Sequence, residues 1–508
     1  MRKKSNLGVN KITMPTHITL TDNTISSFSN GESHSKIHAY QDLQTVSGLQ
    51  ISELCEKNAN LLVFPHCLDE HKNGIYELSI CELVGSPNIN SENQITDVEN
   101  VKIKTGNLMG FVGFSGKGHH GTKLEIRSRF TNNQGQDFFM HYMLEKVFKI
   151  NLFDMSYSYS KNDGFDLLFL IFPHLLKQAL RQGVFRTYKT FEKNDAAIKG
   201  VIDINRHIKY NQPFNGKIAY RSREYSADND MTQLIRHTIE FIKQKSVGQN
   251  ILNNDPDTKS AVNQIIAATD STYCFQNRGK IIHKNIKPVT HPYFSAYKYL
   301  QKLCLLILSH QSIQYSQSNS PVYGILFDGA WLWEEYVATI LRDSMPNVYK
   351  FQHPENKTGK GGIKLFDNSE DSTEDKTFSK CYRKIYPDFY RQNSKSGDFL
   401  QNDGIILDAK YKHLENGFVR DDLYQIISYM HTMEISCGGF IYPLKTEFMD
   451  VKFSFSKLAG LGGKVCAIPF PVIQTAGNYE FFKTQMKKAE KILIDYFMVK
   501  SFSVYTDV

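Results

Sequence analysis

The sequence lacks closely spaced cysteines. It has eight cysteines, and no two of them fall within a Cys-x-x-Cys spacing. Zinc ribbons and cysteine-ligated iron–sulfur clusters need such pairs, so both kinds of site are poorly supported. Scattered cysteines in a chain without a secretory signal are typical of free thiols in a reducing cytosol.

Long hydrophobic runs are missing as well. The N-terminal segment is basic but has no apolar stretch of the kind found in secretory signal peptides. The most apolar run, residues 167–176, is interrupted by Pro173 and His174. It falls short of the roughly 20 apolar residues that span a bilayer. We therefore expect no membrane partner and a cytoplasmic location.

A Walker A motif is also absent. The glycine-rich segment GFVGFSGKGHHGT (110–122) fails the G-x-x-x-x-G-K-[ST] pattern, because Lys117 precedes a glycine and Phe111 replaces the first glycine. The segment is interpreted as a hairpin or a finger-like loop. The chain alone is not expected to hydrolyse GTP or ATP.

Charge is weak for the size of the chain, with a net value of +8 over 508 residues. This charge is compatible with nucleic-acid binding but does not argue for it alone. Hydrophobic residues make up 41% and charged residues 22%. Such a composition excludes wholesale disorder, a collagen-like chain and a coiled-coil rod.

Patterning along the chain predicts an α+β protein of several domains. Residues 1–32 are polar and are expected to form a flexible lead-in. Short apolar runs between Gly, Asn and Ser clusters predict a β-rich domain over 33–130. Helical spacing predominates over 131–318, with a strand-like stretch around 200–204. Strands alternate with helices over 319–508, which predicts a C-terminal α/β domain with a central sheet.

The chemical signal lies in IYPDFY (385–390) followed by GIILDAKYK (404–412). The second segment is an apolar strand that delivers Asp408 and Lys410 to one side, because strand residues alternate faces. With Asp388 from a neighbouring strand, two carboxylates can hold Mg²⁺, which activates a water molecule. The lysine can stabilise the transition state. The pattern predicts a PD-(D/E)xK site for phosphodiester hydrolysis, with both aspartates as metal ligands.

The polar insertion RQNSKSGDFLQNDG between these strands leaves the first metal ligand open. Asp398 or Asp403 could take the place of Asp388. We favour Asp388 because it follows Pro387 in a strand-like stretch, whereas the other two lie among turn-forming residues.

Two helices supply further candidates. Gln425 and Tyr429, one turn apart in a predicted helix over 420–433, could contact DNA phosphate or orient the site. Glu334, in a helix that Asp328 could cap, is a candidate accessory acid. The alternative interpretation is a surface ion pair between the strand residues, with the helix residues serving packing or solvation.

These motifs resemble the McrC-like nuclease subunits of McrBC and LlaJI-type restriction systems. Beyond the catalytic strand, the resemblance covers LEIRSRF with HYMLEKVF, then GVFRTYKTFEKNDAAIKGVIDINRHI, LWEEYV and DLYQIISYM, in that order over about residues 120–435. By position, Asp388, Asp408 and Lys410 match the family's catalytic triplet. The first 110 residues carry no motif that matches.

The resemblance implies a restriction-endonuclease-like C-terminal domain that cuts double-stranded DNA with Mg²⁺. It also implies an McrB-like AAA+ GTPase partner, into whose ring the N-terminal region docks to stimulate nucleotide hydrolysis. The β-rich domain is then the partner-binding domain, and its glycine-rich segment carries Lys117, His119 and His120 on an exposed loop. A stand-alone DNA-repair nuclease of the same fold and a non-catalytic adaptor that activates a partner NTPase are the alternatives.

Overall fold

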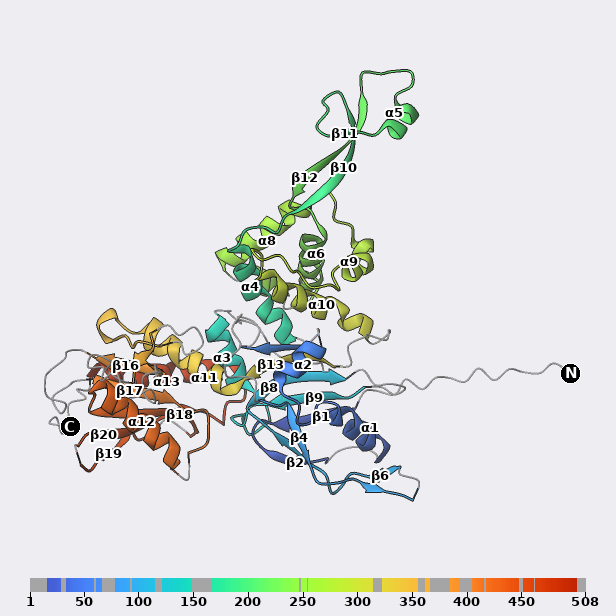
Figure 1. Ribbon diagram of the computed structural model, residues 1–508. Helices are drawn as coiled ribbons and strands as arrows, with labels where there is room; N and C mark the ends of the chain where they lie inside the picture. Colours follow the sequence, from blue (N-terminus) through green and yellow to red (C-terminus); the bar gives the residue numbers. More distant parts are fainter. Residues whose placement is uncertain are drawn as a thin grey trace, which may run out of the picture. The chain divides into compact units, whose positions relative to one another are not determined.

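A computed structural model of the chain is drawn in Figure 1. The structure describes residues 16–28, 33–58, 61–65, 78–91, 94–114, 121–148, 166–245, 248–253, 255–313, 322–354, 361–365, 384–392, 404–414, 417–446, 451–460 and 462–499. These residues form helices and several small sheets, so the predicted mixed α+β class is confirmed.

The chain divides into two compact units. Unit 1 comprises Met1–Lys149, Tyr157–Ser160 and Ser320–Val508, and unit 2 comprises Ile150–Ser156 and Lys161–Asn319. The N-terminal and C-terminal regions, which the sequence predicts as separate domains, thus belong to the same unit. The predicted boundary between 318 and 319 falls one residue before the change from unit 2 back to unit 1.

A five-stranded sheet in the order β1-β9-β8-β13-β3 forms the N-terminal part of unit 1. Its strands are β1 (His17–Thr21), β9 (Lys123–Arg127), β8 (Leu108–Phe114), β13 (Val322–Asp328) and β3 (Leu61–Phe64). Strand β13 pairs antiparallel with β8 and parallel with β3. A segment predicted to open the C-terminal domain therefore completes the N-terminal sheet.

The predicted lead-in is wrong for residues 17–27, which form β1 and β2 (Ile25–Ser27). Strand β1 pairs in parallel with β9, and Leu20 is buried in the core. The segment HITLT alternates polar and apolar residues, which is the period of a half-buried strand. The polar composition of the first 32 residues obscures this short alternation.

Smaller elements complete this part of unit 1. They are α1 (Ser33–Gln44), α2 (Ile51–Lys57), β4 (Cys81–Val84), β5 (Asn88–Ile89), β6 (Ile95–Asp97), β7 (Lys102–Thr105) and α3 (Phe138–Phe148). Strands β2, β7 and β4 form one small sheet, and β5 pairs with β6. Buried side chains such as Leu43, Leu54, Ile103 and Val112 join α1, α2 and β7 to the large sheet in one core.

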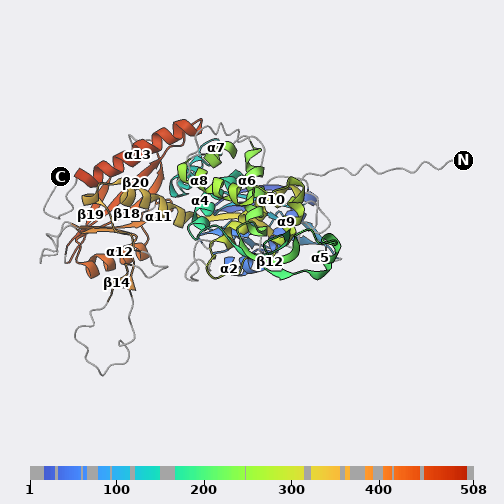
Figure 2. The ribbon, with the colours of Figure 1, turned by 90° about the horizontal axis from the view of Figure 1, so that it is seen from above.

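A second five-stranded sheet, in the order β16-β17-β18-β20-β19, forms the C-terminal part of unit 1. Its strands are β16 (Phe389–Gln392), β17 (Gly404–Ala409), β18 (Cys437–Lys445), β20 (Lys464–Val472) and β19 (Ser454–Lys457). Strands β17, β18 and β20 are parallel, and the two edge strands are antiparallel to their neighbours. Helices α12 (Arg420–Met433) and α13 (Tyr479–Val499) lie on opposite sides of the sheet (Figure 2).

Helix α11 (Gly329–Ala338) leads from β13 toward the second sheet. Asp328 caps it as predicted, because its Oδ1 accepts a hydrogen bond from the backbone N–H of Ala330 at 2.9 Å. A π-helical segment (Thr339–Ser344), a 3₁₀ turn (Asn347–Tyr349) and the pair β14 (Ile363–Lys364) and β15 (Lys384–Ile385) follow. Trp333 of α11 is buried against Phe470 of β20, with ring centroids 5.6 Å apart.

Unit 2 is a group of helices with a three-stranded arm (Figure 1). The helices are α4 (Asp166–Leu180), α6 (Asp230–Lys243), α7 (Gly248–Asn253), α8 (Pro256–Thr269), α9 (Arg278–Lys284) and α10 (Tyr297–Ile313), with a 3₁₀ turn at Phe275–Asn277. The arm consists of β10 (Thr187–Asp195), β11 (Val201–Ile202), α5 (Ile204–Tyr210) and β12 (Ile218–Ser226). Among the described residues, no helix combines the length and apolar character needed to cross a bilayer.

Candidate active site

The two predicted aspartates meet where β16 begins and β17 ends. These strands run antiparallel, with Phe389 opposite Leu407, so the residue before β16 lies beside the last residues of β17. The backbone N–H of Ala409 donates a hydrogen bond to Oδ2 of Asp388 at 2.7 Å. Asp408 lies one residue earlier on β17 and is buried. The fold thus gathers two acids that are far apart in the sequence.

Glu334 is the third acid near this point. Burial raises the pKa of Asp388 well above its usual value, and the neighbouring carboxylates of Glu334 and Asp408 raise it further. The hydrogen bond from Ala409 opposes this shift. Three acids therefore lie close enough for their negative charges to repel one another. A bound cation would reduce this repulsion.

Lys410 supplies positive charge to the site. Its Nζ lies 2.7 Å from Oδ2 of Asp408 and 3.4 Å from Oδ1 of Asp422. Burial alone would lower the pKa of Lys410, but the carboxylates of Asp408, Asp422 and Asp388 outweigh burial and raise that pKa above its usual value. The amine therefore stays protonated at neutral pH.

Helix α12 lines the site with three side chains. Lys410 donates a hydrogen bond from Nζ to Oε1 of Gln425 at 3.2 Å, and Nε2 of Gln425 donates to the hydroxyl of Tyr429 at 2.9 Å. Gln425 and Tyr429 thus share the helix face that the sequence predicts, beside the lysine. Their contact with DNA stays a prediction. Asp422, in the first turn of the same helix, was not predicted as a site residue.

His353 connects Glu334 to the strand that follows Asp388. Its Nδ1 lies 2.6 Å from the backbone oxygen of Asp388, so Nδ1 carries a proton and donates to that carbonyl. Its Nε2 faces Oε1 of Glu334 at 3.8 Å, and its ring stacks on Phe389 with centroids 4.8 Å apart. His353 was not predicted either, because it lies in a polar stretch without a motif.

The donors at the site suit a hard cation. Asp388, Asp408 and Glu334 offer carboxylate oxygens, which are the protein ligands that Mg²⁺ prefers. Within the ranges that the structure describes, no group of three or more His, Cys, Asp or Glu side chains is already arranged to hold a metal. The crowding of acids around Asp388 nevertheless fits a cation, and Asp388 and Asp408 are the residues that would hold it.

Other predicted positions lie outside the described residues. These are Asp398 and Asp403 in the insertion, and Lys117, His119 and His120 in the glycine-rich segment.

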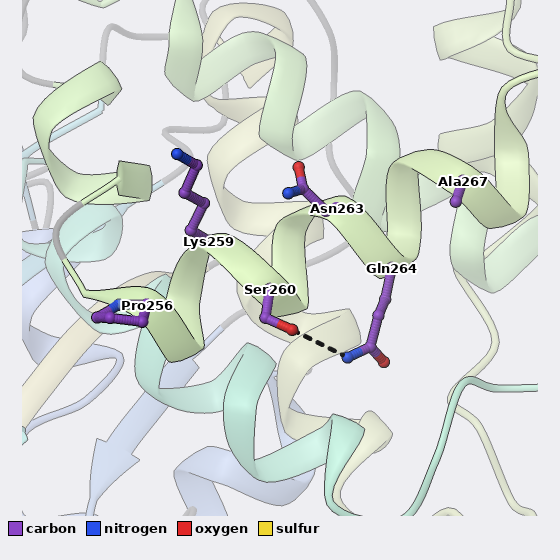
Figure 3. Close-up of a pocket in the computed structure, with 6 residues that line it drawn as sticks. All are labelled: Pro256, Lys259, Ser260, Asn263, Gln264 and Ala267. Atoms are coloured by element: carbon purple, nitrogen blue, oxygen red, sulfur yellow. Dashed lines mark hydrogen bonds between the residues drawn. The ribbon is translucent and has the colours of Figure 1, made fainter.

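A hollow in unit 2 contains none of the predicted site residues. It runs along α8 and is lined by Pro256, Lys259, Ser260, Asn263, Gln264 and Ala267 (Figure 3). Its polar groups include Gln264, which donates to Ser260 at 3.5 Å within the same helix. The hollow lacks the carboxylates of a cation site.

Comparisons with known proteins identify the family to which this chain belongs. The family model described as "McrBC 5-methylcytosine restriction system component" matches residues 103–443. A solved half-complex of Thermococcus gammatolerans McrB AAA+ hexamers with bound McrC is 14% identical, covers 94% of this chain and 100% of that chain, and has a TM-score of 0.45. The McrBC complex of the same organism is 12% identical, covers 64% and 87%, and has a TM-score of 0.27. No curated protein matches. The family match spans more than half of the sequence, and the chain belongs to the McrBC restriction system component family.

Proposed function

We propose that this chain is the Mg²⁺-dependent DNA endonuclease subunit of a GTP-dependent restriction system. The observation that carries the proposal is the meeting of Asp388, Asp408 and Lys410 at the adjoining ends of β16 and β17. The flanking helices α11 and α12 and the mixed sheet are in keeping with a PD-(D/E)xK nuclease domain. Family membership supports a role in restriction, and the site supports phosphodiester hydrolysis as its chemistry.

Each side chain then has a role that its contacts allow. Asp388 and Asp408 would hold the cation, which supplies an activated water and neutralises phosphate charge when it is bound. Lys410 stays protonated, so it can stabilise the negative charge that grows on the phosphate in the transition state. Glu334 acts on Asp388 through its charge, while Gln425 orients the lysine amine.

We extend the proposal to a partner, an McrB-like AAA+ GTPase. A restriction system component works with other components, and the sequence of this chain lacks a Walker A motif of its own. The arm of unit 2 exposes apolar side chains, among them Val201 at 78% and Phe214 at 68%. Exposed apolar side chains that gather in one place mark surfaces for protein contact. We assign partner binding to the residues before β13, and we expect the complex to act in the cytoplasm.

One experiment tests the proposal. The full-length chain is purified with its AAA+ partner, and cleavage of double-stranded DNA is measured with GTP or ATP, with and without Mg²⁺. We expect cleavage only when the chain, the partner, GTP and Mg²⁺ are all present. Cleavage by the chain alone would instead indicate a stand-alone repair nuclease. Stimulated GTP hydrolysis without any cleavage would indicate a non-catalytic adaptor.

A further inference from the structure

Tyr411 follows Lys410 but faces away from the candidate site. It is 5% exposed, and its hydroxyl lies 2.7 Å from Oγ of Ser128 and 3.3 Å from Sδ of Met109. Both partners belong to the N-terminal part of unit 1, at β8 and just after β9. Consecutive residues of the catalytic segment thus touch two different regions, because Lys410 contacts the acids of the site and Tyr411 contacts the N-terminal sheet.

Three consecutive residues hold the ring of Tyr411. Ser128 bonds its hydroxyl, the guanidinium carbon of Arg129 lies 4.9 Å from its ring centroid, and Phe130 packs edge-on at 5.2 Å. These residues end the LEIRSRF motif, to which the proposed chemistry gives no role. We call Ser128, Arg129 and Phe130 the Tyr411 clamp.

The clamp is itself firmly bonded. Arg129 donates from Nη2 to Oδ2 of Asp22 at 2.8 Å and to Oδ1 of Asn107 at 2.6 Å. The backbone N–H of Ser128 donates to Oδ2 of Asp137 at 2.6 Å. Charge-assisted and buried hydrogen bonds of this kind fix geometry more strongly than exposed ones. These bonds therefore hold the clamp in a fixed position, and the clamp in turn fixes the position of Tyr411.

The same ring also touches the start of α11. A Cβ atom at Gly329 would lie 2.7 Å from Cε1 of Tyr411 and 3.1 Å from the backbone oxygen of Asn107, so only glycine permits this approach. The backbone N–H of Gly329 donates to that oxygen at 2.8 Å. Helix α11 carries Glu334. One aromatic ring thus lies between the segment that carries Lys410 and the helix that carries Glu334.

We propose that Tyr411 is a positioning residue, which sets Lys410 and the start of α11 relative to the N-terminal sheet through the Tyr411 clamp. The inference rests on the proposed nuclease function, because it concerns the geometry of that site. A displacement at the ends of β8 or β9 would reach the lysine through this ring. The role of LEIRSRF is then to align a site that lies far from it in the sequence.

The test removes the bond between Tyr411 and Ser128 from either side. Tyr411→Phe and Ser128→Ala are prepared in the full chain and assayed with the partner, GTP and Mg²⁺. Each variant should lower kcat on the order of tenfold, because a small misplacement of catalytic groups is costly. The KM for DNA should stay within about twofold, since no DNA contact is removed. The double variant should lose no more than the single variants, because all three lack the same bond.

Tyr479→Phe is the matched control. The Tyr479 hydroxyl donates to Oε2 of Glu145 at 2.8 Å, so it also joins the two parts of unit 1, and Glu145 is not a residue of the candidate site. This variant should lose thermal stability and keep kcat. If Tyr411→Phe and Ser128→Ala behave like Tyr479→Phe, Tyr411 is only structural and the inference is overturned. If the wild-type chain does not cut DNA, the proposed function is overturned. If the wild type and both variants cut equally well, only the inference about Tyr411 is overturned.

Discussion

Nζ of Lys410 lies 2.7 Å from Oδ2 of Asp408, and a single residue separates the two in the chain. The contact follows from strand geometry, since residues two apart on a strand share a face. It joins the lysine amine to one of the two carboxylates proposed to hold the metal. The pair therefore keeps the lysine protonated and close to the phosphate that the metal would bind.

Asp408→Ala should abolish DNA cleavage while the chain still folds and still stimulates its partner. Loss of a carboxylate ligand should slow cleavage by several orders of magnitude, on the order of 10³ or more. Cleavage and GTP turnover are measured on the same full-length complex. The control is Asp421→Ala, because Asp421 is an exposed acid in the first turn of α12 and should be dispensable. Cleavage at the wild-type rate by the Asp408 variant would remove the nuclease assignment.

Lys410→Ala should stop cleavage but spare Mg²⁺ binding, because the amine stabilises charge and is not a metal ligand. Isothermal titration with Mg²⁺ should give an affinity at least equal to that of the wild type, since Asp408 no longer has this amine beside it. Lys412→Ala is the comparison, because Lys412 pairs with Asp422 and not with Asp408. A fall in metal affinity as large as that of Asp408→Ala would mean that these roles are wrongly divided.

Asp388→Asn should inactivate cleavage as fully as Asp408→Ala. Asp398→Asn and Asp403→Asn should cut normally, since the hydrogen bond from Ala409 joins Asp388 to the catalytic strand. The three variants are compared in one cleavage assay with the partner present. If the Asp398 or Asp403 variant were inactive and the Asp388 variant active, the first metal ligand would lie in the insertion and not at Asp388.

The raised pKa of Asp388 predicts how stability depends on pH. Burial, Glu334 and Asp408 favour the neutral acid, so the folded chain holds this proton more tightly than the unfolded chain. Stability therefore falls as pH rises above the unfolded aspartate pKa of about 3.9, because the unfolded chain releases a proton that the folded chain keeps, and the full cost applies above the raised pKa. Without metal, Asp388→Asn should unfold at a higher temperature than the wild type at neutral pH.

The difference should shrink toward zero near pH 3, where both side chains are neutral, by the same linkage. Thermal unfolding without metal, followed by circular dichroism from acidic to neutral pH, measures it. Saturating Mg²⁺ should stabilise the wild type and not the variant, because the cation binds the ionised acid. Equal unfolding temperatures of wild type and variant at neutral pH would contradict the unfavourable ionisation of buried Asp388 beside Glu334 and Asp408.

A chain that ends at Asn319 should not fold its N-terminal sheet. It lacks β13, which pairs with both β8 and β3 and buries Val322 and Leu326 in their common core. Limited proteolysis should cut within β8 or β3 of this fragment and spare them in the full chain. A fragment as resistant as the full chain would show that β13 is dispensable for this sheet.

Much of the site was predictable because its signals are local. Alternation on β17 puts Asp408 and Lys410 together, and helical spacing puts Gln425 beside Tyr429. Asp422 was missed although helical spacing places it on the face of Gln425, three residues later in the same helix. His353 was not predictable, since tertiary packing alone brings it to the acids. The pairing of β13 with β8 was hidden for the same reason. An apolar strand shows its burial in its composition, but it does not show which neighbour it will join.

The position of β13 also matters for synthesis on the ribosome. Strand β8 and strand β3 are made early, but the strand that lies between them emerges only after all of unit 2 has been translated. During that interval the edges of β8 and β3 that will later pair with β13 have no partner strand. Unpaired edges of apolar strands are prone to pair with other chains. Unit 2 has its own core and can fold first, whereas the N-terminal sheet and the segment that carries Lys410 must form together late in synthesis.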